Sequence, residues 1–178
     1  ENWKRPKSEV TYLMNLLQEF LNDTSGRLDK SNIRIKFIGS KDKLKKTMIK
    51  SMERIEYISK HKTGLTFIIA LNYGARQEIT EAVKKISVDV KEGILDISQI
   101  NEELISSYLY TKDIPDPDLI IRPSGEKRLS NFLLYQASYS ELWYSDILWP
   151  DFNIEHLKEA IVEYNNRKRR FGGRADES

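Results

Sequence analysis

The chain has 178 residues, with 29 Lys and Arg against 27 Asp and Glu, and no cysteine. Hydrophobic residues make up 39% and charged residues 31%, which is typical of a globular protein and excludes a disordered tail. The net charge of +2 gives no whole-chain reason to expect nucleic acid, and the lack of cysteine excludes disulfides and thiolate metal sites and fits a reducing compartment. The longest purely apolar run, 67–71, is far too short to span a bilayer.

Helices and strands alternate along the first half of the chain. Apolar residues at helical spacing predict a helix over 10–21, and alternation over 33–37 predicts a strand. A charged amphipathic helix follows over 44–60. The run 64–71 (GLTFIIAL) is apolar on both sides, as expected for a buried parallel strand.

The second half continues the alternation. Helices are predicted over 77–91, over 98–108 with Ser98 as the N-cap, and over 153–168. Short strands are predicted over 118–121 and 142–144. This order predicts an α/β fold with a largely parallel sheet flanked by helices, and no linker or repeat divides residues 1–178, so one domain is expected.

Polar loops follow two of these strands, where ligands of open α/β sheets gather. The stronger candidate is the loop 122–131, which places Arg122, Lys127 and Arg128 around Gly125 and two serines. Arg presents a planar fork of donors that suits phosphate oxygens, and Gly permits close backbone approach. The loop therefore has the chemistry of a diphosphate site, although on spacing alone a solvated loop with incidental charges is an equal alternative.

Two further features carry charge. Glu141 lies among aromatic residues and could ligate Mg²⁺, but without context an ordinary salt bridge is the commoner role of such a carboxylate. The basic run 167–174 is either a solvated tail or a contact for phosphate or nucleic acid.

Several motifs together carry a family resemblance. The segment 118–136 (DLIIRPSGEKRLSNFLLYQ), with YSEL at 139–142 and LWPDF at 148–152, resembles the signature of cis-prenyltransferases, most closely the bacterial undecaprenyl diphosphate synthases. The opening ENWKRP at 1–6 resembles that family's Ser-Glu-Asn-Trp-x-Arg-Pro motif. Residues 72–76 match its Asn-Tyr-Gly-Gly-Arg element with Ala75 in place of Gly, and 170–172 match its Arg-x-Gly motif.

The resemblance implies an enzyme that joins isopentenyl diphosphate to an allylic primer such as farnesyl diphosphate. Repeated cis additions would give a long polyprenyl diphosphate such as undecaprenyl diphosphate, the lipid carrier for cell-wall sugars. It also implies Mg²⁺ as cofactor, a homodimer, and a cytoplasmic protein that associates transiently with the membrane through its lipid product. No nucleic-acid partner is expected.

The resemblance further implies roles for individual residues. Arg122, Arg128 and Ser130 match positions that hold isopentenyl diphosphate, Leu129 belongs to the same substrate site, and Glu141 matches a Mg²⁺ ligand. Asn2 matches a catalytic position near the departing proton. Because a neutral amide is a poor base, we interpret it as a relay or positioning group. The neighbouring Glu1, Trp3 and Arg5 match substrate-contacting positions, and Leu65 matches a position deep in the product tunnel.

One element of the family pattern is absent from these residues. The Asp-Gly-Asn-Gly-Arg-Trp strand and loop, which aids metal binding and cradles the primer diphosphate, is not found among the 178 residues. We therefore expect the native protein to be active and this segment alone to be inactive. The alternatives are a non-catalytic cis-prenyltransferase-like subunit, which would have no need of the retained Arg122, Arg128, Ser130 and Glu141, and a nucleic-acid-binding module that uses the basic tail.

Overall fold

A computed structural model describes residues 2–28 and 31–169. The chain divides into two compact units, Glu1–Lys112 and Asp113–Ser178. This division does not test the expectation of one domain, which stays a prediction. None of the helices described is both long and apolar enough to cross a membrane.

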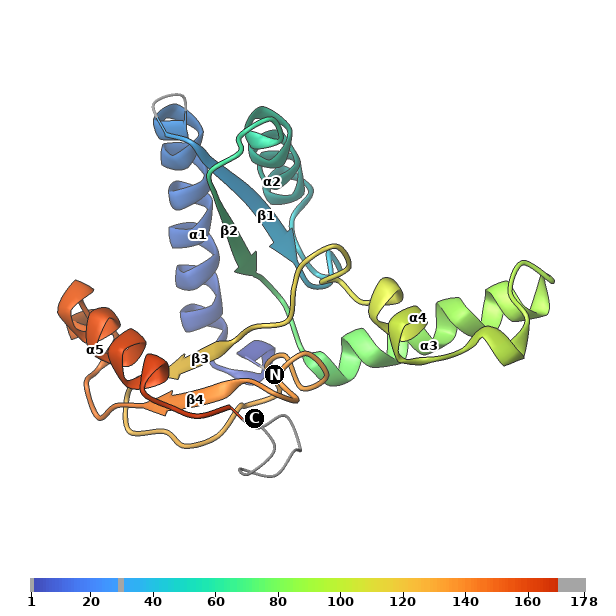
Figure 1. Cartoon of the computed structure of the whole chain (residues 1–178). Helices are drawn as coiled ribbons and strands as arrows, with labels where there is room; N and C mark the ends of the chain where they lie inside the picture. The colour runs from blue at the N-terminus through green and yellow to red at the C-terminus, as the bar shows by residue number, and fades with distance from the viewer. Residues whose placement is uncertain (1, 29–30, 170–178) are drawn as a thin grey trace. The chain divides into compact units, whose positions relative to one another are not determined.

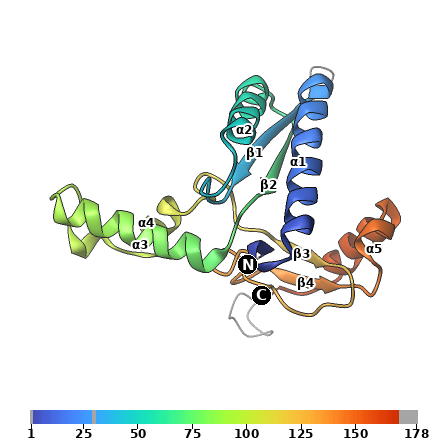
Figure 2. The same ribbon diagram turned by 180° about the vertical axis from the view of Figure 1, so that it is seen from behind.

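The first unit contains a parallel strand pair. Strand β1 (Ile33–Ile38) pairs with β2 (Leu65–Ala70), with Ile33 opposite Leu65 and Ile38 opposite Ala70. Helix α2 (Lys46–Ser59) connects the two strands, and α1 (Lys7–Arg27) precedes them. Both helices lie beside the strand pair in the two opposite views (Figures 1 and 2).

The core of this unit forms between α1, α2 and β1. Leu21 from α1, Ile35 from β1, and Met48, Met52 and Ile55 from α2 are almost fully buried and contact one another in one cluster. Burying one such side chain stabilises a fold by about 1.5–3 kcal/mol. The two helices and two strands predicted in this part of the chain are thus confirmed, with ends shifted by a few residues.

The burial expected of the second strand is only partly observed. Leu65 is 64% exposed and Phe67 is 48% exposed, whereas Ile69 packs against the core cluster. Within the described residues, β2 has β1 as its one hydrogen-bonded neighbour, and α2 packs on β1. An apolar run predicts a strand that can be buried, but neighbouring elements decide how much of it is covered.

Helix α3 (Ala75–Lys91) is followed by the short 3₁₀ helix η3 (Ile97–Gln99) and by α4 (Glu102–Tyr108). The prediction that Ser98 caps this last helix is wrong. Asn101 is the N-cap, and its Oδ1 accepts from Leu104 N at 2.8 Å, while Ser98 lies inside η3. Both residue types are good caps, but only Asn101 stands directly before the helix.

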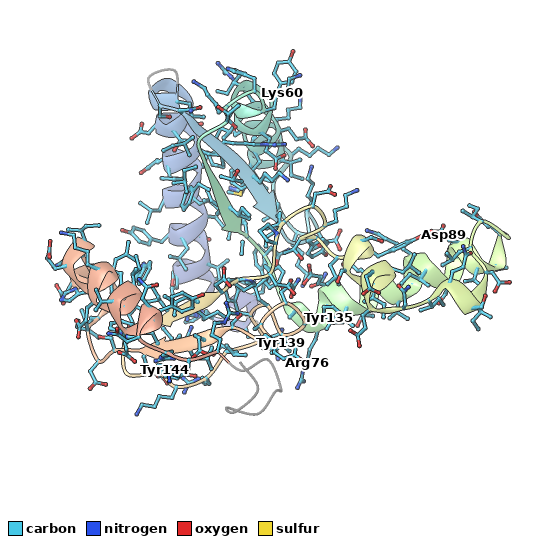
Figure 3. The ribbon with its side chains drawn as sticks, in the orientation of Figure 1. Lys60, Arg76, Asp89, Tyr135, Tyr139 and Tyr144 are labelled. Carbon is cyan, nitrogen blue, oxygen red and sulfur yellow. The ribbon has the colours of Figure 1, made fainter. Side chains whose placement is uncertain are left out.

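Tyrosine–carboxylate hydrogen bonds hold α4 and the residues after it against α3. Tyr108 donates to Asp89, a residue of α3 labelled in Figure 3, at 2.5 Å, and Tyr110 donates to Glu81 at 2.6 Å. The buried carboxylate of Glu78 accepts from the backbone N of Tyr110 at 2.8 Å. Burial and the bond to Glu81 raise the pKa of Tyr110, and the same bond lowers the pKa of Glu81.

The second unit has its own parallel strand pair. Strand β3 (Leu119–Arg122) pairs with β4 (Glu141–Tyr144), and η4 (Trp149–Asp151) and α5 (Ile154–Asn165) follow. Asn153 caps α5: its Oδ1 accepts from Glu155 N, and its own N donates to His156 Nδ1. The predicted strands and helix are confirmed, and with them the α/β class and the parallel pairing.

Candidate active site

The polar loops of the second unit meet at the carboxyl ends of β3 and β4. Ser124 N donates to Ile147 O, and Gly125 N donates to Ser145 O, both at 2.8 Å. These bonds join the loop after β3 to the loop after β4. The candidate diphosphate loop is therefore anchored at the edge of the strand pair where ligands of parallel sheets bind.

Gly125 makes the turn in this loop possible. Its φ is +70°, in the left-handed region, and a Cβ at this position would lie 3.2 Å from Oδ1 of Asp146. Any other residue would add backbone strain and a close contact. The glycine thus lets the chain turn tightly between Arg122 and Arg128.

A pocket of about 410 Å³ lies beside this loop. Its lining combines a cationic and hydroxyl-bearing edge with apolar side chains, a combination that suits a small ligand with a charged head and an apolar body. The residues are Ile120, Ile121, Arg122, Pro123, Ser124, Glu126, Arg128, Leu129, Phe132, Leu142, Tyr144 and Trp149. Tyr144, at the end of β4, is labelled in Figure 3.

Arg122 has one buried donor that the described residues leave unsatisfied. Its Nη2 donates to Ser130 Oγ at 3.3 Å, but its Nε is buried and has no hydrogen-bond partner among the residues that the structure describes. A buried donor without an acceptor costs about 1–3 kcal/mol. Arg128 is exposed and forms an ion pair with Glu126.

The structure brings together the predicted residues of this loop. Arg122, Arg128 and Leu129 line one pocket, and Ser130 is hydrogen-bonded to Arg122 without being part of the lining. Ser130 has a φ of +50°, an uncommon conformation for a residue with a Cβ. Its hydroxyl is therefore held at Arg122 by a tightly turned backbone.

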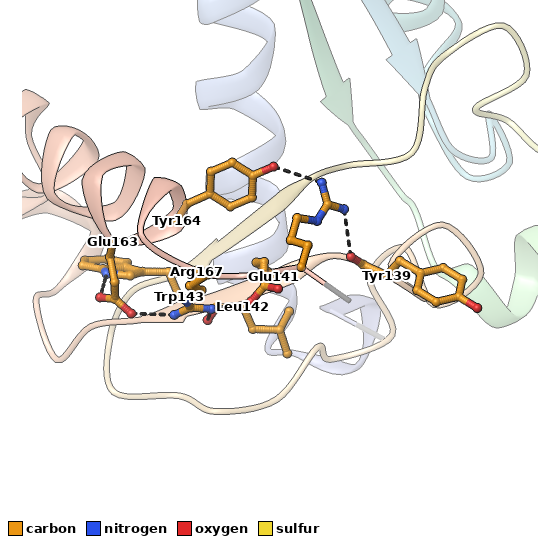
Figure 4. A network of polar contacts seen from close by, with 8 residues as sticks. Tyr139, Glu141, Leu142, Trp143, Glu163, Tyr164 and Arg167 are labelled. Atoms are coloured by element: carbon orange, nitrogen blue, oxygen red, sulfur yellow. Dashed lines mark hydrogen bonds and ion pairs between the residues drawn. The ribbon is translucent and has the colours of Figure 1, made fainter. Parts of the chain in front are cut away.

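Glu141 is held by Arg167 (Figure 4). Oε2 of Glu141 lies 2.8 Å from Nη1 of Arg167, which also donates to Leu142 O at 3.0 Å. Nη2 of the same guanidinium donates to Glu163 at 2.5 Å, and Glu163 also accepts from Trp143 Nε1 at 2.9 Å. The carboxylate expected to bind Mg²⁺ is thus also the partner of a salt bridge.

The pKa values in this network shift as these contacts require. The hydrogen bond to Glu141, followed by that to Glu163, raises the pKa of Arg167. The bond from Arg167 lowers the pKa of Glu163. Arg167 and Glu163 are therefore held in their charged forms.

The basic run does not begin as a solvated tail. Besides the contacts of Arg167, Arg169 lies 2.6 Å from Asp118 and donates to Tyr164 Oη at 3.0 Å and Tyr139 O at 3.2 Å. The first arginines of the run therefore bind groups within their own unit. The predicted Arg-x-Gly motif at 170–172 lies outside the described residues.

Trp3 anchors the opening motif within the first unit. It is the central residue of the 3₁₀ helix η1 (Asn2–Lys4), and its Nε1 donates to Asn72 Oδ1 at 2.6 Å. Arg5 forms an exposed ion pair with Glu9 at 2.6 Å. Glu1 lies outside the described residues, and only the backbone of Asn2 is described. The substrate roles of these residues, and that of Leu65 at the start of β2, stay predictions.

Two contacts of these sites were not predicted from the sequence. Asn72 was noted as part of a motif but not as the partner of Trp3, which lies 69 positions away. Arg167 was noted as part of the basic run but not as the partner of Glu141. Its spacing of four from Glu163, within the helix predicted over 153–168, was the local signal available for an ion pair.

Comparison with known proteins decides the family. The family model described as "Putative undecaprenyl diphosphate synthase" matches residues 1–172. The chain belongs to this prenyltransferase family. It is 51% identical over 173 residues to an isoprenyl transferase of Clostridium tetani, a match that covers 97% of this chain and 68% of that protein. The predicted enzyme class, cis-prenyltransferase, is confirmed in preference to a non-catalytic subunit or a nucleic-acid-binding module.

Solved structures agree with the fold of this prenyltransferase. Lavandulyl diphosphate synthase from Lavandula x intermedia, in complex with dimethylallyl diphosphate, has a TM-score of 0.91 and 36% identity over 96% of this chain and 74% of its own. A probable undecaprenyl diphosphate synthase from Campylobacter jejuni has a TM-score of 0.84 and 37% identity over 96% of this chain and 78% of its own.

Proposed function

We propose that this prenyltransferase condenses isopentenyl diphosphate with an allylic diphosphate, farnesyl diphosphate, and repeats the cis addition to give a long polyprenyl diphosphate such as undecaprenyl diphosphate. The observation that carries this proposal is the pocket beside loop 122–131, whose lining combines Arg122 and Arg128 with apolar side chains. A diphosphate would accept from the guanidinium groups, and the C5 chain would occupy the apolar part.

The reaction breaks the C1–O bond of the allylic primer and forms a bond from that carbon to C4 of isopentenyl diphosphate. The primer's diphosphate leaves with the electron pair, and a proton is lost from C2 of the isopentenyl unit. Arg122, Arg128 and Ser130 would hold the isopentenyl diphosphate by charged and neutral hydrogen bonds. Fixing that head group fixes C4 relative to the primer, and such positioning is a large part of catalysis.

The proton-transfer step is assigned to the region of Asn2. An amide neither gains nor loses a proton near neutral pH, so Asn2 would orient the departing proton through a hydrogen bond rather than accept it. Trp3 and Arg5, on the same short segment, would contact substrate beside it.

Mg²⁺ is proposed as the cofactor, with Glu141 as its ligand. No cluster of three His, Cys, Asp or Glu side chains suited to a metal occurs among the described residues. Mg²⁺ is often bound by one or two carboxylates together with substrate phosphate oxygens, and Glu141 with the diphosphate would supply such ligands. When bound, the ion would neutralise charge on the diphosphate. Because Arg167 already holds Glu141, the guanidinium and the cation would share that carboxylate.

We further propose a cytoplasmic homodimer that meets the membrane when it releases its lipid product. Exposed apolar side chains of the second unit support an interface, since such patches mark contact surfaces. They include Leu148, Trp149, Ile154 and Val162. The family resemblance suggests that residues 170–178 of one subunit act in the active site of the other. Mixing two full-length variants, one lacking 170–178 and one carrying Glu141→Ala, tests this, because the mixed dimer would contain one site with both Glu141 and a donated 170–178 segment. Activity should then partly return, and no recovery in a confirmed heterodimer would reject this arrangement.

The proposed reaction is tested by incubating the full-length protein with labelled isopentenyl diphosphate, Mg²⁺ and farnesyl diphosphate, and by sizing the product. We expect primer-dependent incorporation into a long polyprenyl diphosphate. No incorporation with any allylic primer would reject the proposed reaction.

A further inference from the structure

The side chain of Asn72 joins three segments of the first unit. Its Oδ1 accepts from Trp3 Nε1 at 2.6 Å, and its Nδ2 donates to Ser40 O at 2.9 Å and to Asp42 O at 2.8 Å. Its backbone O also accepts from Ser40 N at 3.2 Å. Asn72 therefore connects the opening 3₁₀ helix, the loop after β1 and the turn after β2.

The chemistry of the partners fixes the orientation of this amide. An indole N–H can only donate and a backbone carbonyl can only accept. If the amide were rotated by 180°, its NH₂ group would face the indole N–H, and its oxygen would face the two backbone carbonyls. Asp would lose both donors and place a negative charge against the carbonyls of Ser40 and Asp42. Asn72 also has a φ of +49°, a conformation that Asn adopts more readily than most residues.

Packing immobilises the other end of this connection. The indole of Trp3 is partly buried and packs against the core cluster that contains Leu21 and Met48. Its ring is thus held by apolar contacts and its N–H by Asn72. Backbone contacts reinforce the anchor: Leu71 N donates to Ile38 O at 2.9 Å, and a Cβ on Gly39 would lie only 2.1 Å from Leu71 O.

We infer that Asn72 is a positioning residue that sets the place of the 2–5 segment through Trp3. This inference rests on the proposed function, because it matters to catalysis only if Asn2, Trp3 and Arg5 act on substrate. The proposed isopentenyl diphosphate residues, Arg122 and Arg128, belong to the other unit. Loss of Asn72 should therefore lower kcat and leave the KM for isopentenyl diphosphate nearly unchanged.

The test uses Asn72→Gly in the full-length protein, because glycine keeps the positive φ and removes only the side chain. The matched control is Asn32→Gly. Asn32 Oδ1 accepts from Thr63 N at 3.0 Å near the other end of the same strand pair and does not contact Trp3 in any described bond. We expect Asn72→Gly to lower kcat by roughly 10- to 100-fold, the scale of a misplacement of about 1 Å, and Asn32→Gly to leave kcat near the wild-type value.

Trp3→Phe, which removes the indole N–H and keeps an aromatic ring, shows whether Asn72 acts through Trp3. If it does, combining Trp3→Phe with Asn72→Gly should lower kcat no further than the more severe single variant. The chain has three tryptophans, so ¹⁹F NMR of 5-fluorotryptophan-labelled protein gives a direct readout. The Trp3 resonance, assigned by its loss in Trp3→Phe, should shift in Asn72→Gly and not in Asn32→Gly.

An unchanged kcat in Asn72→Gly, fully additive losses, or an equal loss in Asn32→Gly would each overturn the inference. If Asn72→Gly does not fold, the inference is tested by Trp3→Phe alone. An unchanged kcat in Trp3→Phe would show that Asn72 does not act on catalysis through Trp3. Failure of the proposed function looks different: the wild-type protein would then incorporate no isopentenyl diphosphate at all.

Discussion

Nη1 of Arg167 lies 2.8 Å from Oε2 of Glu141 and 3.0 Å from the carbonyl oxygen of Leu142. One guanidinium therefore binds both a side chain and the backbone of β4. These residues lie 26 and 25 positions apart in the chain. The contact ties the residues after α5 to the strand pair that carries the candidate active site. It also places a fixed positive charge beside the one carboxylate proposed to bind Mg²⁺.

Replacing Glu141 should affect both catalysis and folding. Glu141→Gln in the full-length protein removes the charge that Mg²⁺ and Arg167 share. We expect isopentenyl incorporation to fall by roughly 100-fold, the scale of one group that stabilises developing charge. Stability should fall by about 1–3 kcal/mol from the weakened charged hydrogen bond. Incorporation against Mg²⁺ concentration, together with thermal unfolding, measures the two effects.

The control for this substitution is Glu163→Gln, which weakens the other ion pair of Arg167 and leaves Glu141 in place. It should lower thermal stability without changing the dependence on Mg²⁺. A normal Mg²⁺ dependence in Glu141→Gln would end the assignment of Glu141 as a ligand and leave it a purely structural partner of Arg167.

Arg128→Lys should not behave as a conservative change. Lysine keeps the positive charge but lacks the planar fork that can bind two phosphate oxygens. We expect the KM for isopentenyl diphosphate to rise roughly tenfold or more, which corresponds to the loss of one charged hydrogen bond of about 1.5–3 kcal/mol. The neighbouring exposed Lys127, changed to Arg, provides a control of equal charge. An unchanged KM for isopentenyl diphosphate with altered primer kinetics would place Arg128 at the binding site of the allylic primer.

Two glycines have nearly the same backbone conformation, so substituting each of them distinguishes the effect of backbone strain from an effect on the pocket. Gly125 has a φ of +70° and Gly93 a φ of +72°, but a Cβ on Gly125 would lie 3.2 Å from Asp146 while one on Gly93 would contact nothing within 4 Å. Each change to Ala should cost about 1–2 kcal/mol from the left-handed backbone. Steady-state kinetics should show a raised KM for isopentenyl diphosphate in Gly125→Ala alone. Equal kinetics in the two variants would mean that the turn at Gly125 does not shape the pocket.

Alkaline pH should weaken the contacts between α3 and the residues after α4. Burial and the bond to Glu81 raise the pKa of Tyr110, so the folded protein keeps the phenol protonated at a pH where the unfolded chain, with a pKa of about 10, has begun to lose the proton. The stability from this group is therefore complete below about pH 10 and is lost as the pH rises toward the folded pKa. Chemical unfolding of the wild-type protein and Tyr110→Phe at pH 8 to 11 should show a shallower decline in the variant. Parallel declines would mean that Tyr110 does not contribute to the alkaline loss.

Much of the local architecture followed from the sequence. Periodicity located the strand that became β1 and the helices that became α1, α2, α3 and α5, because a helix or strand is favoured by residues within a few positions of one another. The loop between Arg122 and Ser130 was identified for the same reason, since its arginines, glycine and serines are neighbours in the chain. The family also followed from the sequence, through several motifs in the right order.

The partners of the functional side chains were decided only by the tertiary structure. Nothing near Glu141 in the sequence indicates that Arg167 would bind it, and nothing near Trp3 indicates Asn72. The exposure of Leu65 and Phe67 could not be read from an apolar run either, because burial depends on which elements pack against a strand. Local patterns encode what each segment becomes, but contacts between residues tens of positions apart exist only after the segments have packed.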